Sequence, residues 1–286
     1  LQEEDPVIST LLHPARLSEF VEITGNSIGN ILKKVKSTKS AGVDEVPMAV
    51  LKDHASTLAR HIASVANAVL DTGWPECWKQ AEVVPLWKKK GSKNDPCMYR
   101  PIALLPAVAR IVERAISCKL KEHIRATGVL PRFQHGFRPK HGCESAILHL
   151  VSQVAEARNR GEAVFMSSAD CSAAFDTVSH EILLRKLETT CGVQGKALRL
   201  LQTYLSGRTQ RVRLSGERTS SWQPIACGVP QGSVLGPLLF SLYTADIGHS
   251  VTGAELVTYA DDVTLVTSDK DPQRARQKMN IALQQL

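Results

Sequence analysis

The sequence lacks the paired cysteines of disulfide or zinc frameworks, and it has no long apolar run. Its 286 residues include seven cysteines, an odd number with no C-x-x-C pair. This excludes a secreted disulfide framework and a cysteine-rich zinc module. The most apolar central stretch, 234–245, has 12 residues, fewer than the roughly 18 that span a bilayer. Residues 1–5 are acidic, unlike a signal peptide. We therefore expect a reduced, intracellular protein without a membrane segment.

The composition is that of a folded domain with a basic surplus. Hydrophobic residues make up 43% and charged residues 22%, and the net charge is +7. Residues 79–140 contain 14 Lys and Arg against four Asp and Glu, with Lys88, Lys89 and Lys90 at their densest point. Arg208, Arg211, Arg213 and Arg218 form a second basic cluster. Such runs are often solvated surface, but two of them favour contact with the phosphates of a nucleic acid.

The apolar periodicity predicts helices that alternate with short strands. We expect an α+β protein, because the strands occur as short hairpins and not as βαβ units. Helices are predicted over 18–36, 49–70, 108–124, 144–158, 180–188, 196–205, 237–244 and 272–286, the last continuing to the end of the sequence. Strands are predicted over 82–87, 101–105, 163–166 and 208–214, with two more in 255–266.

Two adjacent carboxylates, Asp261 and Asp262, lie between the β-prone arms of segment 256–266. Two charges about 4 Å apart repel by about 1 kcal/mol in water and about 4 kcal/mol at an effective dielectric constant of 20. A divalent cation would remove this repulsion, and oxygen ligands suit Mg²⁺ or Mn²⁺. An ordinary turn is the alternative, since Asp is common in turns.

Asp170 favours the metal site over the ordinary turn. It follows an apolar strand, so it is expected at a strand end where it could face the tip of a neighbouring hairpin. Carboxylates from different strands can hold two cations about 3.5–4 Å apart, as phosphoryl transfer requires.

Six segments in this order resemble the reverse transcriptase family, in the form found in non-LTR (LINE-type) retrotransposons. Tyr259-Ala260-Asp261-Asp262 matches the YxDD box, and 170–176 (DCSAAFD) matches the first catalytic block. The other matches are AGVDEVP at 41–47, YRPI at 99–102 with Leu104-Leu105, QHGFRP at 134–139 and GVPQGSVLGPLLF at 228–240. YxDD alone is moderately specific, whereas six ordered blocks are very specific.

The resemblance implies a right-hand polymerase fold with an antiparallel palm sheet flanked by helices. It divides the chain into an N-terminal helical extension (1–78), fingers (79–164) and mostly palm (165–286), with a possible return to the fingers around 195–225. Only 24 residues follow Asp262, so we expect the thumb and an endonuclease to lie outside this sequence, and the chain to be a piece of a longer polypeptide.

The resemblance also assigns roles. Asp170 and Asp261 would be the main ligands of two Mg²⁺ or Mn²⁺ ions, with Asp262 and the Cys171 backbone carbonyl supporting them. Phe175 would be the steric gate against ribonucleotides, and Asp176 is interpreted as structural. Nucleotide binding is expected from Arg100, Gln231, Gly232, Lys88 and Lys89, and template binding from Arg138.

The implied activity is RNA-directed DNA polymerisation, with an RNA template, a DNA primer and dNTPs as partners. In a eukaryote, the implied location is the nucleus and cytoplasm. The stretch after Arg138, PKHGCE, departs from the Gly-Arg-Ser-Thr-like stretch of the family. A group II intron or retron enzyme, an RNA-dependent RNA polymerase and a non-catalytic nucleic-acid-binding relic remain alternatives. His135, His141, Cys143 and His149 lack the paired spacing of a zinc site. No oligomeric state is indicated.

Overall fold

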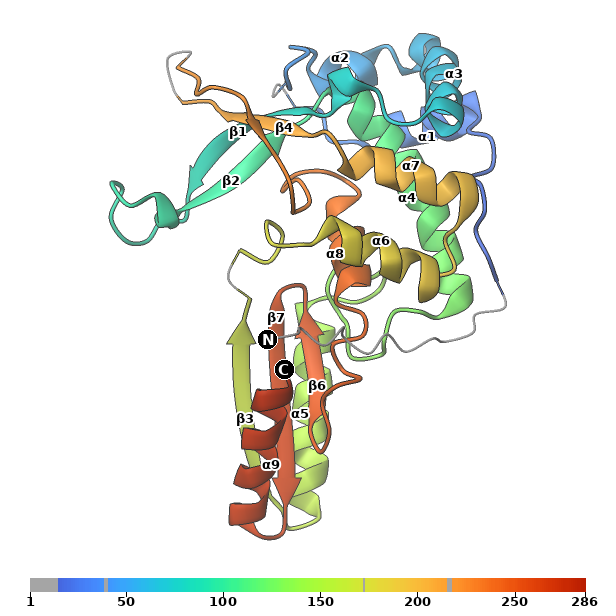
Figure 1. Cartoon of the computed structure of the whole chain (residues 1–286). Helices are drawn as coiled ribbons and strands as arrows, with labels where there is room; N and C mark the ends of the chain where they lie inside the picture. The colour runs from blue at the N-terminus through green and yellow to red at the C-terminus, as the bar shows by residue number, and fades with distance from the viewer. Residues whose placement is uncertain (1–14, 39–40, 172, 215–217) are drawn as a thin grey trace. The chain divides into compact units, whose positions relative to one another are not determined.

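The computed structural model of the chain describes residues 15–38, 41–171, 173–214 and 218–286 (Figure 1). Two compact units are present, each built from two chain segments. The first unit comprises Leu1–Thr127 and Phe175–Gly236, and the second comprises Gly128–Ala174 and Pro237–Leu286. Helices and short strands are mixed in both, as the predicted α+β class requires.

Helices form most of the first unit. They are α1 (Gly25–Lys34), α2 (Met48–Asp53), α3 (Ala55–Thr72), α4 (Ala107–Thr127), α6 (His180–Thr189) and α7 (Gly195–Leu205), with 3-10 turns η1 (Glu76–Trp78) and η2 (Pro96–Met98). The core contains fully buried side chains of α4, α6 and α7, including Ile111, Leu120, Leu183 and Leu201. The apolar periodicity predicted a helix in each of these three segments.

Two predicted helices have different bounds in the structure. The helix expected from residue 18 begins only at Gly25, because the Asn67 side chain hydrogen-bonds both the N–H and the carbonyl of Ile23, and the next residue, Thr24, is an extended N-cap. The helix expected over 49–70 is broken between α2 and α3 at His54 (φ −105°, ψ 25°), whose ring Nδ1 lies 3.0 Å from the Val50 carbonyl oxygen. Side-chain hydrogen bonds to the backbone therefore outweigh periodicity at both places.

A mixed four-stranded sheet completes the first unit. Its strands are β1 (Gln80–Trp87), β2 (Tyr99–Leu104), β4 (Thr209–Val212) and β5 (Gln223–Pro224) in the order β2-β1-β4-β5. β1 pairs antiparallel with β2 and parallel with β4. Leu86 of β1 is opposite Arg100 of β2, so the basic 88–90 turn and Arg100 belong to one hairpin.

A buried carboxylate joins β1 to β4. Glu82 is 4% exposed, and its two carboxylate oxygens accept from Arg211 (3.1 Å from Nε) and Arg213 (2.6 Å from Nη1). Arg211 also stacks on Trp222. Arg208 is 1% exposed and donates to the Tyr204 carbonyl. The expectation that the second basic cluster contacts phosphate is therefore wrong for Arg208, because its guanidinium is inside the core.

We predict that Glu82→Ala lowers the free energy of unfolding by about 2–3 kcal/mol, because the substitution leaves two guanidinium groups without their buried partner. Urea unfolding of the purified chain measures this change. Glu122→Ala is the matched control, since the Lys119–Glu122 pair is exposed and its loss should cost less than about 0.5 kcal/mol. Equal effects of both substitutions would contradict the prediction.

The second unit is a three-stranded antiparallel sheet with a helix on each face. β3 (Ala163–Asp170), β7 (Asp262–Asp269) and β6 (Glu255–Tyr259) lie in the order β3-β7-β6. Along β7, Val263 and Leu265 pack with Met279 of α9 (Pro272–Gln285), and Val266 faces α5 (Cys143–Asn159) on the other side (Figure 1). α8 (Gly236–Tyr243) begins one residue before the expected position and crosses from one unit to the other along the chain.

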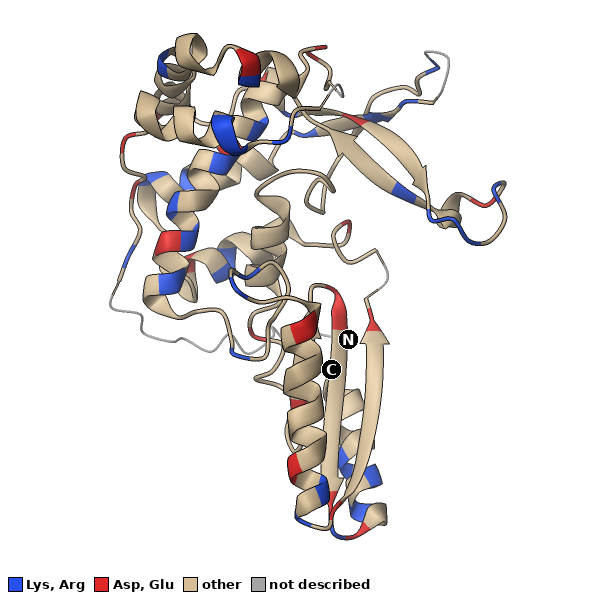
Figure 2. Ribbon diagram, turned by 180° about the vertical axis from the view of Figure 1, so that it is seen from behind, with Lys and Arg blue, Asp and Glu red and all other residues tan. Residues whose placement is uncertain are grey.

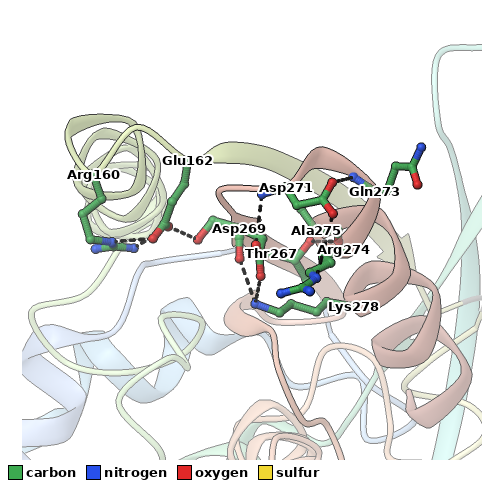
Figure 3. A network of polar contacts seen from close by, with 10 residues as sticks. Arg160, Glu162, Thr267, Asp269, Asp271, Gln273, Arg274, Ala275 and Lys278 are labelled. Carbon is green, nitrogen blue, oxygen red and sulfur yellow. Dashed lines mark hydrogen bonds and ion pairs between the residues drawn. The ribbon is translucent and has the colours of Figure 1, made fainter.

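The two ends of this sheet differ in how their acidic groups are satisfied. At the end where Ala163 pairs with Asp269, cations neutralise the acids: Asp269 with Lys278 and Glu162 with Arg160 (Figure 3). These contacts lower the pKa of Asp269, and the Arg160 and Ser268 hydrogen bonds lower that of Glu162 to about 2. At the opposite end, Asp170 pairs with Asp262, and the ribbon ends there are acidic (Figure 2).

Candidate functional site

Backbone register brings the three predicted carboxylates together at one end of the second unit's sheet. Asp170, the last residue of β3, lies directly opposite Asp262, the first residue of β7. Tyr259 of β6 is paired with Asp262, so Ala260 and Asp261 form a two-residue turn. Ala260 has φ 57°, the positive value that such hairpin turns require at their first central position. The sequence prediction that Asp170 faces the tip of the acidic hairpin is confirmed by this register.

The surroundings of Asp262 disfavour its charged form. Burial raises the pKa of Asp262, and the charges of Asp261 and Asp170 raise it further. Burial and the same three carboxylates raise the pKa of the Cys171 thiol, which therefore stays protonated. None of the three carboxylates forms an ion pair with a Lys, Arg or His in the described part of the chain. Like charges opposite each other destabilise a sheet, so this arrangement has no structural benefit by itself.

The donor atoms fit a hard divalent cation. As the side chains are placed, the described residues contain no group of three His, Cys, Asp or Glu that could hold a metal ion. Mg²⁺, however, is usually held by one or two carboxylates together with waters and substrate phosphates, and not by a full protein cage. The Asp170–Asp262 pair and Asp261 supply such carboxylate oxygens, and the Cys171 carbonyl follows directly in the chain.

The 133–136 segment supports the acidic hairpin from the free edge of β6. Thr258 donates its N–H to the Phe133 carbonyl, and His135 donates its N–H to the Thr258 carbonyl, both at 2.9 Å. Gly136 packs so closely that a Cβ there would overlap the backbone nitrogen of Ala260. The block interpreted from the sequence as template-side therefore also holds the turn that carries Asp261.

Arg138 and the nearby histidines have partners inside the second unit. Arg138 donates from Nη1 to the Pro131 carbonyl at 2.9 Å. His135 hydrogen-bonds Ser145 Oγ through Nδ1 (2.8 Å) and His149 Nδ1 through Nε2 (3.1 Å). These histidine nitrogens are thus used within the protein, and burial lowers the pKa of His135.

The predicted nucleotide residues Gln231 and Gly232 lie on a tightly held loop of the first unit. Gln231 accepts the N–H of Ala103 at 2.7 Å, and its side chain donates to Asp176 Oδ2 at 2.9 Å. Gly232 has φ 115° and approaches the Ala103 carbonyl so closely that a Cβ would be 2.7 Å from it. A cavity of about 320 Å³ is lined by Gln231, Asp176, Ala103 and ten further residues of the same unit.

The remaining predicted nucleotide residues also belong to the first unit. Arg100 is exposed on β2, and Phe175 is half-buried with its carbonyl accepting from Val229 N–H. Lys88 donates its ammonium to the Cys97 carbonyl, whereas Lys89 is exposed at φ 59°. Lys93 lies over the Trp87 ring.

A family comparison decides the identity of this arrangement. The family model "Reverse transcriptase (RNA-dependent DNA polymerase)" matches residues 87–286, which include both acidic blocks. The chain belongs to the reverse transcriptase family.

This reverse transcriptase chain is similar in sequence to polymerases from mobile elements of flies. The RNA-directed DNA polymerases from mobile element jockey of Drosophila melanogaster and of Drosophila funebris are each 32% identical to it, over 87% and 86% of the chain and 28% and 27% of the relatives. The probable RNA-directed DNA polymerase from transposon X-element of Drosophila melanogaster is 33% identical, over 82% of the chain and 26% of the relative. The chain therefore spans about a quarter of the length of these relatives. These matches confirm the predicted LINE-type resemblance.

The contacts of three residues at these sites were not predicted. Asp176 was interpreted as structural, and in the structure it accepts a hydrogen bond from the Gln231 side chain, a partner that the sequence did not indicate. The supporting role of Gly136 and Thr258 also went unrecognised. The glycine in Gln-His-Gly is a signal for a close backbone approach, but the sequence does not show which strand this segment contacts.

We predict that Asp262→Asn stabilises the metal-free chain at pH 7 by about 0.2–1 kcal/mol, because it removes a like-charge cross-strand pair. A carboxyl whose pKa is raised on folding favours the folded state at low pH, and that contribution is lost as the pH rises through the raised pKa. The gain should therefore shrink toward pH 4. Urea unfolding with a chelator present measures it, and added Mg²⁺ should stabilise the unsubstituted chain more than the variant.

Asp269→Asn is the matched control at the other end of the same strand. Its pKa is lowered by Lys278, so its ionised form favours folding above the ordinary Asp pKa and loses this effect as the pH falls. Neutralising it should lower stability at pH 7. Destabilisation by both substitutions would refute the idea that the Asp170–Asp262 end is electrostatically strained.

We predict that Gly136→Ala lowers the free energy of unfolding by about 1–3 kcal/mol, because the added methyl group displaces the acidic turn. Hydrogen exchange at 257–262 should accelerate as well. Gly29→Ala in α1 is the control, since its Cβ would lie at an ordinary 3.8 Å from the Ala59 Cβ. A Gly136→Ala chain as stable as the original would show that the contact is not restrictive.

Proposed function

We propose that this chain supplies fingers and most of the palm of an RNA-directed DNA polymerase, with the second unit's sheet as palm. The polymerase adds dNMP to a primer 3′-hydroxyl on an RNA template and releases pyrophosphate. The observation that supports this most is the register pairing of Asp170 with Asp262 next to Asp261 in a chain of the reverse transcriptase family. Without a cation, this carboxylate group would only destabilise the sheet.

Asp170 and Asp261 are proposed as the main ligands of two Mg²⁺ or Mn²⁺ ions, with Asp262 and the Cys171 carbonyl as supporting ligands. When bound, such ions activate the primer 3′-hydroxyl and neutralise the charge of the leaving pyrophosphate. The protein holds the acidic turn in place through the Thr258 and His135 backbone hydrogen bonds. The raised pKa of Asp262 favours metal binding at neutral over acidic pH.

Substrate binding is proposed for residues of both units. Gln231 and Gly232 would contact the incoming dNTP, Arg100 its triphosphate, and the Phe175 ring the sugar, where it would exclude a 2′-hydroxyl. Lys89, exposed at the basic turn, is a better phosphate ligand than Lys88, whose ammonium binds the Cys97 carbonyl. Arg138 would contact the template backbone, since a guanidinium has more donors than its single bond to Pro131 uses.

The proposed partners are an RNA template, a DNA primer and dNTPs, and the proposed location is the nucleus and cytoplasm of a eukaryotic cell. In the described part of the chain, every helix is too short or too polar to cross a bilayer.

The experiment is primer extension by a protein that carries this chain with its native flanking sequence. With Mg²⁺, an RNA template and dNTPs, we predict that Asp261→Ala lowers incorporation by at least about 1,000-fold, because it removes a charge needed at the transition state. Asp269→Ala removes a carboxylate from the far end of the same sheet and should keep most of the activity despite its lower stability.

Two further measurements distinguish the alternative functions. Incorporation of rNTPs in preference to dNTPs would identify an RNA polymerase. Salt-sensitive RNA binding without incorporation by the unsubstituted protein would identify a non-catalytic binding protein. Equal incorporation by the Asp261→Ala variant would refute the proposal outright.

A further inference from the structure

A buried carboxylate in the first unit has no place in the reaction described above. Glu113 lies in the second turn of α4, is 1% exposed, and is surrounded in sequence by the buried residues Ile111, Val112 and Ile116. An ionisable group in such a position is costly unless it is hydrogen-bonded. Its partners therefore indicate why it is there.

Glu113 binds the end of the Gly- and Pro-rich loop 228–236. Its Oε2 accepts the backbone N–H of Val234 at 2.6 Å and that of Leu235 at 3.1 Å. Hydrogen bonds of this kind to a carboxylate are the strong class, each about twice a neutral one. Burial raises the pKa of Glu113, while the two N–H bonds and the charges of Arg208 and Arg110 oppose that rise.

The same loop is held at its other end and in its middle by separate contacts. Gly228 and Val229 donate their N–H groups to the carbonyls of Val178 and Phe175, at 2.7 and 2.8 Å. Ala103 of β2 donates its N–H to the Gln231 carbonyl. Glu113 provides a further contact at Val234, three residues after Gln231, on the part of the loop that these hydrogen bonds do not reach.

We propose that Glu113 is a positioning residue that sets the dNTP affinity of the polymerase by holding Gln231 and Gly232 in place. The inference rests on the proposed function, because it assumes that these two residues contact the incoming nucleotide. Glu113 itself is buried and acts only through the loop. Removing its acceptor would release the N–H groups of Val234 and Leu235 while leaving the acidic hairpin of the second unit intact.

The test compares Glu113→Leu with Glu113→Gln in the protein with native flanking sequence. Leu fills the same volume without an acceptor, and Gln keeps an oxygen for the two N–H groups. We expect Glu113→Leu to raise the KM for dNTPs roughly tenfold with kcat within about twofold, the effect of losing one or two hydrogen bonds. Glu113→Gln should stay within about threefold of the original KM for the same reason. Concentrations are normalised by active-site titration.

Hydrogen exchange provides a readout that general destabilisation would not reproduce. In Glu113→Leu, exchange should accelerate in peptides covering 228–236 and stay unchanged in peptides from α4 and from β1–β2. Ser117→Ala, another buried polar position one turn along α4, is the matched control and should change neither KM nor loop exchange. If Glu113→Leu does not fold, Glu113→Asp replaces it, because the shorter side chain keeps the charge and withdraws the acceptor.

The outcomes separate the two proposals. No incorporation by the unsubstituted protein would refute the proposed function. An active protein in which the acceptor-deleting variant keeps the original KM would overturn the positioning role. Faster exchange spread evenly over α4 and the loop would overturn it too, because it would mean that Glu113 only stabilises the helix.

Discussion

The cross-strand pairing of Asp170 with Asp262 is the constraint around which the second unit is arranged. It places two like charges face to face at one end of an antiparallel sheet, next to a third carboxylate in the turn. The apolar contacts between the sheet and α9 must therefore hold the strands in register against this repulsion. The hydrogen bonds from the 133–136 segment serve the same purpose at the edge strand. The fold thus stabilises an arrangement that its own electrostatics oppose, which is expected at a cation site.

The same unit contains an internal comparison for this interpretation. At the far end of β3 and β7, Glu162 and Asp269 are neutralised by Arg160 and Lys278, and their pKa values are lowered. At the near end, the pKa of Asp262 is raised. Acidic residues at the two ends of β7 therefore have opposite electrostatic environments. The amino-acid composition does not explain this difference, whereas a cation-binding role for the Asp170–Asp262 end would explain it.

The acidic site was more predictable from the sequence than the nucleotide loop. Local patterns predicted the strand that ends at Asp170 and the hairpin that carries Asp261 and Asp262, and the family resemblance indicated that the two meet. Helix bounds failed where a distant side chain overrides the pattern, as Asn67 does at Ile23. Asp176 and Gly136 were missed because their roles depend on segments more than 50 residues away in the chain, Gln231 and Ala260 respectively.

Buried charged residues explain why the number of charged residues in a segment is a poor guide to the charge of its surface. Glu82 and Glu113 lie in the most basic segment of the sequence, and both are inside the protein, where one binds two arginines and the other two backbone N–H groups. Arg208 is equally hidden. The basic surface is therefore carried by other residues, notably Lys89 and Arg100 of the β1–β2 hairpin. The second cluster loses Arg208 to the core and commits Arg211 and Arg213 to Glu82, so it presents less unpaired positive charge than its sequence suggests.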